Sequence, residues 1–449
     1  MSHLRPWIRA ARRSYSVKAT GYTAMGSFHT PSIDDIFEQG AIELPVVMDD
    51  HGPPTAFGTP MRQHFFLDPA WTFINHGAFG ASLRPGMAAA QQWRELAERQ
   101  PLKFYDRELF FYLVHAIQAL ASALHAPPKD VVLLPNATSG LNAVIQSMAA
   151  TMQPGDSIYS LDVAYGAVKK LLHQVCAEKQ LVHASHALSF ADAHDDDAII
   201  ARIAETLPAS GCRLVVMDHI TSNTATVLPV QRITELCHAR GIPVLLDGAH
   251  GLLNLPLDLS AIGADFYVGN CHKWLSAPKG AAFLHVAPHY QSIIRPQVQS
   301  HGMDDGFQST FLWTGLQDYA SLLALPACLS FWASHNVEAV RAYMHTTAAD
   351  AATELTRHWQ LPPARDVPSH KQCSMRLVAL PPRVFGTSST PTSVDAKLVQ
   401  DSLHFLHAIE VPVKCIEGHL YVRLSAHVYN TTSNYARLAD VVRSASVSV

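Results

Sequence analysis

Leu245-Leu246-Asp247-Gly248-Ala249-His250 and, further along the chain, Gly269-Asn270-Cys271-His272-Lys273-Trp274 are the stretches that decide the fold. The first predicts a buried strand that runs into an acid, and the second predicts a short strand that ends in a lysine. Because the carboxyl ends of neighbouring parallel strands meet at one edge of a sheet, we expect both polar groups at that edge. An acid and an amine placed there indicate a ligand-binding site.

Strands and helices alternate on the amino-terminal side of these stretches. The predicted strands are 131–135, 157–161, 181–184 and 213–218, and the predicted helices that follow them are 136–152, 164–179, 198–207 and 230–240. Two earlier helices, 86–99 and 106–125, are predicted as packing elements. This spacing implies right-handed crossovers and a mostly parallel sheet with helices on both faces.

The order of elements changes beyond residue 285. A long helical stretch, 316–359, is interrupted near Pro326 and His335 and leads to a strand at 375–380. A helix at 394–408, a hairpin through Glu417-Gly418 and a closing helix from Ser433 complete the chain. We therefore predict an arm at 34–70, a large α/β domain at 71–320 and a smaller α+β domain at 321–449.

Composition excludes several classes of protein. The chain has 449 residues, 48% of them apolar and 16% charged, which is ample for a large core. A net charge of -4 gives no reason to expect nucleic acid or an anionic membrane as partner. The longest apolar run, 322–333, contains Pro326 and predicts a core helix. Seven scattered cysteines without a CxxC pair favour reduced thiols.

Histidine is abundant, with 26 residues, and three of them precede a run of acids: His183, His186 and His194, followed by 195–197. Such residue types bind transition metals. The patch falls between predicted elements, however, so we interpret it as a solvated loop and predict no metal site.

Residues 1–33 contain no Asp or Glu and carry five basic residues, Arg5, Arg9, Arg12, Arg13 and Lys18. This composition predicts a mitochondrial transit peptide, and Arg13-Ser14-Tyr15-Ser16 resembles a processing site. The alternative is a disordered basic arm on an enzyme of the cytoplasm.

The acid and the amine match what pyridoxal 5'-phosphate requires. A lysine bonds covalently to its aldehyde, and an acid keeps its pyridine nitrogen protonated. Asn136-Ala137-Thr138-Ser139-Gly140 opens a helix, whose exposed amides, dipole and hydroxyls would cradle an anion. The same residues also fit an ordinary helix cap. Motifs of competing nucleotide, hydrolase and zinc sites are absent from the sequence.

Further polar residues fall at predicted strand ends. Those on or just after such ends are Tyr165, Asp218, Asn223, Asp247, His250, His272 and Lys273. Scattered core polar residues would not be expected to converge in this way. Asn75 and His76 end a short predicted strand as well, although an Asn-His-Gly turn is often only a turn.

Several motifs together resemble class V aminotransferase-fold enzymes of the isopenicillin N epimerase-like and cysteine desulfhydrase-like group. They are Asn75-His76-Gly77, Asn136-Ala137-Thr138, 218–222, 247–250, 267–274 and 277–281. The resemblance extends from about Phe73 to Tyr429. It implies the type I fold of pyridoxal-phosphate-dependent transferases, in which a large domain with a mostly parallel seven-stranded sheet precedes a smaller α+β domain.

The resemblance also implies roles for single residues at the cofactor. Lys273 would bond covalently to pyridoxal phosphate, Asp247 would pair with its pyridine nitrogen, and His250 would contact the region of its phenolic oxygen. Tyr165 would lie against the ring. The remaining residues that we expect at the cofactor are Ala137, Thr138 and His272 at the phosphate, Asn223, and Thr314, which resembles a residue that reaches the phosphate of a neighbouring subunit. A homodimer is therefore expected.

Arg423 matches the arginine that grips a substrate α-carboxylate, and Asn75 and His76 are expected beside the substrate. In this family, Lys273 would remove the Cα proton and Tyr165 would donate a proton to a leaving sulfur. The expected activity is a carbon-sulfur lyase that acts on L-cysteine or a cysteine conjugate by α,β-elimination. Alternatives are an epimerase of the isopenicillin N type and a non-catalytic protein that kept the fold.

Two departures from the family bear on the substrate. Relatives often carry Asp-His-Glu-Tyr-Gly where this chain has Asp162-Val163-Ala164-Tyr165-Gly166. Desulfurases of this fold need a nucleophilic cysteine on a mobile loop before the carboxylate arginine. Cys415 lies inside a predicted strand shortly before Arg423, and Cys373 lies too far back, so persulfide chemistry is disfavoured.

Overall fold

The structure is a computed structural model that describes residues 28–40, 42–46, 53–303, 305–362 and 367–446. The predicted processing site and most of the predicted transit peptide lie outside these residues, so the structure does not test import. The arm that follows includes a short helix, α2 (Ile33–Glu38), and a 3-10 turn at Thr59–His64. Among the described residues, no helix is long and apolar enough to cross a membrane.

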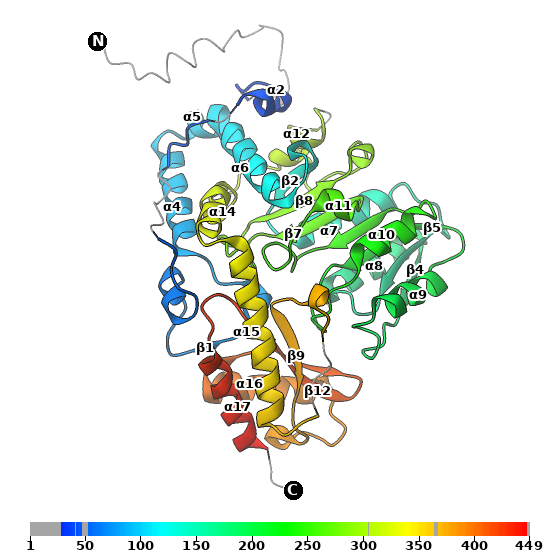
Figure 1. The fold of residues 1–449 in the computed structure, drawn as a ribbon. Coiled ribbons are helices and arrows are strands. Elements are labelled where there is room, and N and C mark those ends of the chain that lie inside the picture. Colours follow the sequence, from blue (N-terminus) through cyan, green and yellow to red (C-terminus); the bar gives the residue numbers. More distant parts are fainter. Residues whose placement is uncertain (1–27, 41, 47–52, 304, 363–366, 447–449) are drawn as a thin grey trace.

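A seven-stranded sheet forms the centre of the molecule (Figure 1). Its strands are β2 (Val131–Leu134), β3 (Ser157–Leu161), β4 (Val182–His186), β5 (Cys212–Asp218), β6 (Val244–Asp247), β7 (Phe266–Asn270) and β8 (Ala282–Val286). The order is β2-β8-β7-β6-β5-β3-β4, and β8 runs antiparallel to the other six strands, which are parallel to one another. This arrangement confirms the predicted mostly parallel α/β sheet.

Helices cover both faces of this sheet because successive residues of each buried strand point into different cores. Val132 and Leu134 face a core shared with α7 (Ala137–Ala149) and α8 (Gly166–Lys179). Val131 and Leu133 face the opposite core. The helices of that second core include α4 (Arg84–Arg99), α6 (Leu109–Leu124), α9 (Asp196–Thr206), α10 (Val230–His238) and α14 (Leu325–Ser334).

The carboxyl-terminal part has its own antiparallel sheet, ordered β11-β12-β9. Its strands are β9 (Met375–Ala379), β11 (Val413–Ile416) and β12 (His419–Ser425), and its helices are α15 (Val337–His358), α16 (Ser393–His407) and α17 (Thr432–Ala445). The predicted hairpin through Glu417-Gly418 joins β11 to β12. Strands, helices and a separate core together form the α+β unit that the sequence predicts.

A short strand near the amino-terminal end joins this carboxyl-terminal part. Strand β1 (Thr72–Phe73) pairs in parallel with β10 (Ile409–Glu410). The backbone N–H of Ser425 in β12 donates to the carbonyl of Ile74. Residues directly before Asn75 are therefore held by strands more than 330 positions later in the chain.

Two predicted elements differ from the structure. Strand β7 ends at Asn270, and the strand predicted to reach Lys273 is wrong there: the N–H groups of Cys271 and His272 both donate to the carbonyl of Ala281, which curls the chain into a turn. The predicted helical stretch 316–359 is divided into α13 (Ala320–Leu323), α14 and α15.

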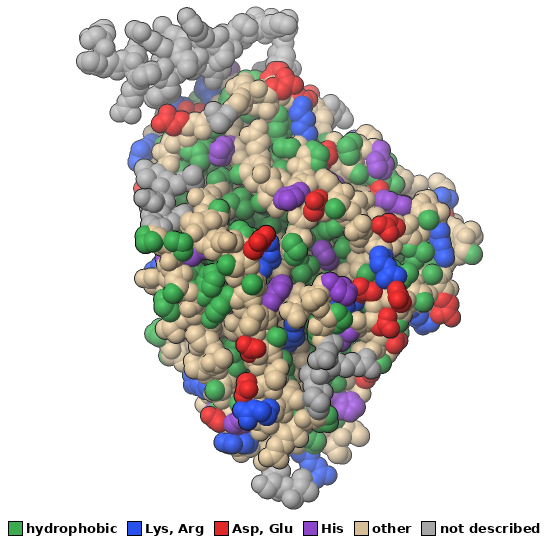
Figure 2. All heavy atoms as spheres, in the orientation of Figure 1, with side chains coloured by type: hydrophobic (Ala, Val, Ile, Leu, Met, Phe, Trp, Pro, Cys, Tyr) green, Lys and Arg blue, Asp and Glu red, His purple; other side chains and the backbone are tan. Residues whose placement is uncertain are grey.

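The first of those divisions falls at Ala324. Pro326 belongs to the first turn of α14, where a missing N–H costs nothing. The second division lies at His335, as predicted, and the Asn336 side chain caps α15. The other short helices are α3 (His76–Phe79), α5 (Pro101–Lys103), α11 (Leu259–Ile262) and α12 (Phe307–Leu312). On the face drawn in Figure 2, acidic and basic side chains are interspersed.

Candidate active site

Three ionisable side chains at or just beyond the carboxyl ends of β5, β6 and β7, those of Asp218, Asp247 and Lys273, lie close enough to shift one another's pKa values. Asp218 and Asp247 end adjacent strands as register partners, and both are buried. Burial lowers the pKa of Lys273 to about 8, against the effect of Asp247, which raises it. Burial raises the pKa of Asp247. Burial together with the negative charge of Asp247 raises the pKa of Asp218 well above its usual value. Asp247 and Lys273 thus lie at the same edge of the sheet and influence each other electrostatically, although no ion pair joins these two described residues.

This carboxyl pair fits a cationic ring nitrogen. The N–H of Ala249 donates to Asp247 Oδ1 over 3.0 Å, and burial raises the pKa of this carboxyl group against the lowering effects of that hydrogen bond and of Lys273. A protonated pyridine nitrogen beside Asp247 would supply the missing positive charge. The donor set at the strand ends therefore fits pyridoxal phosphate.

The protonation state of His250 follows from its neighbours. Trp274 Nε1–H, which can only donate, donates to His250 Nδ1 over 3.2 Å, so a neutral ring carries its proton on Nε2. Burial and the charge of Lys273 lower the pKa of His250 well below 6.5, which keeps the ring neutral. Its Nε2 lies 3.4 Å from Lys273 Nζ. His250 is thereby a fixed donor for an oxygen beside the lysine, as its predicted contact with the phenolic oxygen requires.

Two stacked histidines support the Lys273 segment from behind. His76 Nε2 lies 2.9 Å from the Lys273 carbonyl, and its Nδ1 lies 2.8 Å from Tyr429 Oη. His427 Nε2 lies 3.1 Å from the Trp274 carbonyl, and the two imidazole rings stack with centroids 3.9 Å apart. Burial lowers the pKa of His427 to about 3, and burial followed by His427 lowers that of His76 well below 6.5. Both rings are therefore neutral.

This geometry argues against the substrate contact that we predict for His76. The residue is fully buried, and both its ring nitrogens already bind protein groups. A substrate would have to break one of these hydrogen bonds to reach the ring. In this structure His76 instead positions the backbone of Lys273.

Arg423, on β12, lies close enough to His250 and Lys273 for its charge to lower the pKa of both. It binds the carbonyl and hydroxyl of Ser222 through Nη1 and Asn75 Oδ1 through Nη2, the last over 3.2 Å. Glu410 in turn accepts from Asn75 Nδ2 over 2.9 Å. Asn75 and Arg423, both predicted at the substrate, are thus brought together.

Arg423 is only 4% exposed, and burial lowers its pKa to about 10, which leaves it charged at neutral pH. No carboxylate of the described residues forms an ion pair with it, and its buried Nε has no hydrogen-bond partner among them. A buried cation with a free donor is a strong site for a carboxylate, because the ion pair replaces the interactions with water that the cation lost on burial. This arrangement fits the predicted grip on a substrate α-carboxylate.

The start of α7 offers a phosphate fewer free hydrogen-bond donors than the sequence suggests. Asn136 caps the helix by accepting from Ser139 N–H and Oγ–H, and Ala137 N–H donates to Asn270 Oδ1 over 2.9 Å. The amide predicted at Ala137 is therefore already occupied. Thr138 is exposed, and no hydrogen bond from its N–H or hydroxyl to another described residue is found, so it remains the available donor.

His272 complements Thr138. Its Nδ1–H donates to the carbonyl of Ala281 over 2.9 Å, and burial lowers its pKa to about 4. An anion at Nε2 would favour the protonated ring and raise that pKa. The phosphate role of His272 remains a prediction that this geometry permits.

Tyr165 precedes α8, and 46% of it is exposed. Its backbone N–H donates to Asp218, which ties the tyrosine to the carboxyl pair. The exposed ring is available to stack on a flat ligand. Asn223 and Thr314 are partly buried, and the roles predicted for them stay predictions, that of Thr314 because it involves a second subunit.

The structure adds residues that sequence reasoning missed: Ser222, Asn270, Trp274 and His427. Trp274 and Asn270 lie within the quoted lysine motif, so their position was a usable signal. His427 had none, because its partner carbonyl belongs to Trp274, 153 positions away in the chain.

Fold and site together define a pyridoxal-phosphate enzyme of the type I fold. The family model of class V aminotransferases matches residues 113–434, and the chain belongs to that family. Pyridoxal 5'-phosphate is its cofactor. With the solved structure of a C-DES mutant that holds glycine linked to pyridoxal phosphate, the chain shares 19% identity and a TM-score of 0.73, covering 86% of this chain and 100% of the other. That likeness confirms the predicted fold.

Curated relatives carry two kinds of name. The chain is 30% identical over 403 residues to a putative L-cysteine desulfhydrase 1 of Oryza sativa subsp. japonica, covering 82% of each chain. It is 29% identical over 402 residues to a probable chloroplastic L-cysteine desulfhydrase of Arabidopsis thaliana, covering 84% of this chain and 83% of the other. It is also 29% identical over 400 residues to the isopenicillin N epimerase of Amycolatopsis lactamdurans, covering 86% and 98%. The chain is an enzyme, and its relatives include proteins named L-cysteine desulfhydrase and proteins named isopenicillin N epimerase.

Proposed function

We propose that the chain is a carbon-sulfur lyase that acts on L-cysteine or a cysteine conjugate by α,β-elimination. Elimination would release the sulfur compound and aminoacrylate, and hydrolysis of the aminoacrylate by water would give a keto acid and ammonia. The observation that carries this proposal is the Lys273 amine, whose pKa of about 8 suits a general base, in one site with the Arg423 guanidinium. The Nε of Arg423 is buried without a partner, and no carboxylate of the described residues pairs with the guanidinium. The relatives named L-cysteine desulfhydrase support the choice of substrate.

Each residue then has a task at a stated atom. When bound, the cofactor supplies an electron sink for the charge that develops at the substrate Cα. Arg423 orients the α-carboxylate, with Asn75 and Ser222 fixing the guanidinium. Lys273 Nζ takes the Cα proton as the Cα–H bond breaks. The Cβ–S bond then breaks, and Tyr165 Oη, on the exposed face, gives a proton to the leaving sulfur.

The cysteines support elimination over persulfide transfer. Cys415 lies in β11, where its thiol donates to the carbonyl of Pro391 over 3.2 Å, and the connection to β12 is the tight turn at Glu417-Gly418. Burial raises the pKa of Cys373, which is fully enclosed. A persulfide acceptor must be a thiolate that reaches the substrate sulfur. Neither thiol meets that requirement in this structure.

An epimerase remains the second candidate, favoured by the match to isopenicillin N epimerase over 98% of that relative's length. In that case Tyr165, on the exposed face, would return a proton to Cα. A non-catalytic role is disfavoured, because Lys273, Asp247 and Arg423 are all present in one site.

The test incubates the pyridoxal-phosphate-loaded enzyme with L-cysteine, with a cysteine-conjugate sulfoxide and with other L-amino acids in heavy water. Sulfide, keto acid and ammonia in stoichiometric amounts support the lyase. Racemised substrate with deuterium at Cα and no keto acid would contradict the lyase and support the epimerase. A Lys273→Ala control excludes catalysis by free cofactor.

We further propose that the enzyme is a homodimer in the mitochondrion, with the cytoplasm as the alternative compartment. Phe79 and Leu316 are large apolar residues with 78% and 70% of their surface exposed, as expected at a subunit interface. Import is supported by the composition of residues 1–33 alone, and one relative is named chloroplastic. Sedimentation of the purified chain tests the dimer, and a fluorescent fusion of residues 1–33 tests import.

A further inference from the structure

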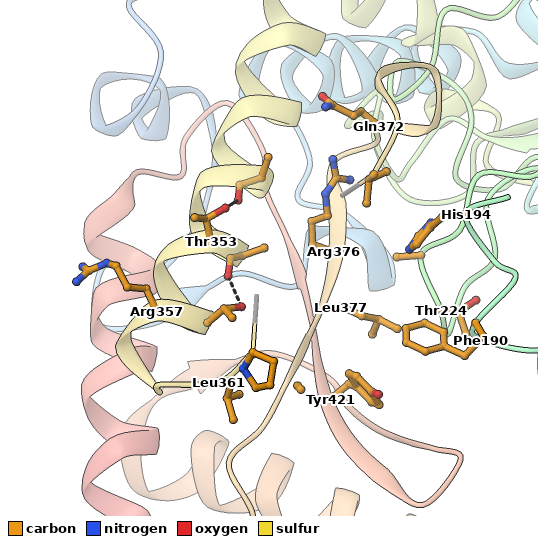
Figure 3. Close-up of a pocket in the computed structure, with 18 of the residues that line it drawn as sticks. Phe190, His194, Thr224, Thr353, Arg357, Leu361, Gln372, Arg376, Leu377 and Tyr421 are labelled. Carbon is orange, nitrogen blue, oxygen red and sulfur yellow. Dashed lines mark hydrogen bonds between the residues drawn. The ribbon is translucent and has the colours of Figure 1, made fainter. Parts of the chain in front are cut away.

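A cavity of about 980 Å³ lies apart from the cofactor site, between the carboxyl-terminal half of α15, strand β9 and the loop at 187–195 (Figure 3). None of the residues assigned above to the cofactor or substrate lines it. Its volume is at the upper end of the range of small-molecule sites. The cavity therefore has room for a ligand of its own.

The walls of this cavity are largely apolar. Phe190 and Tyr421 contact each other edge to face, with ring centroids 5.4 Å apart, and Leu361 and Leu377 line the other sides. The hydroxyls of Thr353 and Thr356 donate to carbonyls of their own helix, over 3.1 and 2.8 Å, so these polar groups are already satisfied. An apolar ligand surface would be buried here without losing hydrogen bonds.

Arg376 is a buried cation in this largely apolar lining, which also includes the polar side chains of His194, Gln372 and Glu417. It is 8% exposed, and its Nη1 donates to the carbonyls of Cys373 and Met375 over 2.8 and 3.0 Å. No carboxylate of the described residues forms an ion pair with it. The carboxylate of Glu417, which also lines the cavity, accepts from Phe190 N–H over 3.1 Å. A buried guanidinium without a counter-ion favours an anion beside it.

Arg357 lines the same cavity but differs from Arg376 both in burial and in having a counter-ion. It is exposed and paired with Glu354 over 2.6 Å, and in Figure 3 its guanidinium points away from the cavity, whereas that of Arg376 lies along it. The chain thus offers one uncompensated arginine and one compensated arginine at a single cavity. The pair supplies a matched control.

We propose that this cavity is a second binding site, for a small amphipathic carboxylate. The apolar part of the ligand lies between Phe190 and Leu361, and its carboxylate pairs with Arg376. A ligand in this cavity also contacts residues that lie next to Arg423 or to its hydrogen-bond partner Ser222. Leu377 is the register partner of Arg423, and Thr224 in the cavity wall lies two residues from Ser222, which binds Arg423.

The test measures binding by calorimetry to the full-length, cofactor-loaded enzyme, with octanoate as the probe and octan-1-ol as its uncharged counterpart. Octanoate is expected to bind one site per chain, at least about tenfold more tightly than octan-1-ol. Arg376→Gln keeps a donor for the two carbonyls but removes the charge, and it should weaken octanoate binding by at least about tenfold. Arg357→Gln should leave it unchanged.

A second variant guards against a folding defect at Arg376. Thr353→Trp fills the cavity from an exposed helix position and keeps the charge, so it should abolish binding while the melting temperature stays near that of the wild type. Equal affinity for octanoate and octan-1-ol would overturn the proposal. So would octanoate affinity that survives both Arg376→Gln and Thr353→Trp, or the absence of any binding up to the solubility limit.

Discussion

The two sides of the Lys273 segment differ sharply. Behind it, His76 and His427 are buried, stacked and hydrogen-bonded to successive backbone carbonyls. In front of it, Tyr165 is exposed. Burial raises the pKa values of Asp218 and Asp247 and lowers the pKa of the Lys273 amine. On the rear side, protein groups satisfy both ring nitrogens of His76 and Nε2 of His427, and His427 Nδ1 alone of these four nitrogens has no partner. The front side, by contrast, is complete only with a ligand.

This difference teaches where mutations should act. Substitutions on the rear side should cost folding free energy, because they leave buried polar groups unpaired. Substitutions on the front side should cost binding or chemistry while leaving the fold intact, because functional groups are held at the expense of stability. Each of the following experiments tests this difference between the rear and the front side.

The largest effect is expected for Lys273→Ala on the front side. Loss of the amine should lower activity by at least about 10³-fold and abolish the visible absorbance of the bound cofactor, because both depend on the lysine. The free energy of unfolding without cofactor should not fall, since a buried charge is removed. Lys169→Ala, at an exposed helix position, is the control and should retain the absorbance. An active Lys273→Ala enzyme would refute the site.

Arg423→Lys should have the next largest effect. A lysine keeps the charge but loses the paired contacts to Ser222 and Asn75, and with them the fork that matches a carboxylate. We expect kcat/KM to fall by about 10- to 100-fold, mainly through KM. Steady-state kinetics with L-cysteine measures this. A change confined to kcat would mean that Arg423 acts on the chemistry and not on substrate binding.

His76→Phe tests the rear side. The substitution keeps an aromatic ring against His427 but leaves the Lys273 carbonyl and the Tyr429 hydroxyl without their partner. The free energy of unfolding in urea should fall by about 2 kcal/mol. KM for the substrate should change little, since the ring does not face it. A large rise in KM at unchanged stability would restore the substrate contact predicted from the sequence.

The pH dependence of stability without cofactor separates the sides further. The pKa of Lys273 is about 8 in the folded chain and 10.5 in its ordinary environment, so between these values the unfolded chain binds more protons. Stability should therefore rise with pH through this window, by on the order of 1–2 kcal/mol from this group. Below about pH 8 the full cost of burying the charge is present. Urea unfolding of wild type minus Lys273→Met at about pH 7.5 and 9.5 measures it, and an unchanged difference would contradict the lowered pKa.

The smallest effect concerns the second cavity. An occupant that packs against Leu377 and Thr224 should stiffen the support of Arg423 and lower KM for L-cysteine by about threefold at saturating octanoate. Arg376→Gln should remove this response. If octanoate leaves the KM for L-cysteine unchanged, the cavity and the front side are energetically independent.

Local patterns in the sequence were sufficient for the sheet and for the meeting of Asp247 with Lys273, because strand ends of a parallel sheet share an edge. The turn beyond β7 escaped prediction, since it depends on the Ala281 carbonyl accepting from two N–H groups. The pairing of Asn75 with Arg423 has no local signal at all, since 348 positions separate the residues. Family resemblance predicted only that both residues lie at the substrate, not that they bind each other.

The hydrogen bonds between β1 and the last strands bear on how the enzyme comes into being on the ribosome. The large sheet spans 131–286 and consists of elements close in sequence, so it can fold early in synthesis. Asn75, made before all of them, must wait for β10 and β12 before it meets Glu410 and Arg423. A nascent chain can therefore bring Asp218, Asp247 and Lys273 to one edge of the sheet while it is still unable to grip an amino acid. The support of Lys273 by His427 and the grip on the substrate are both added only when translation is nearly over.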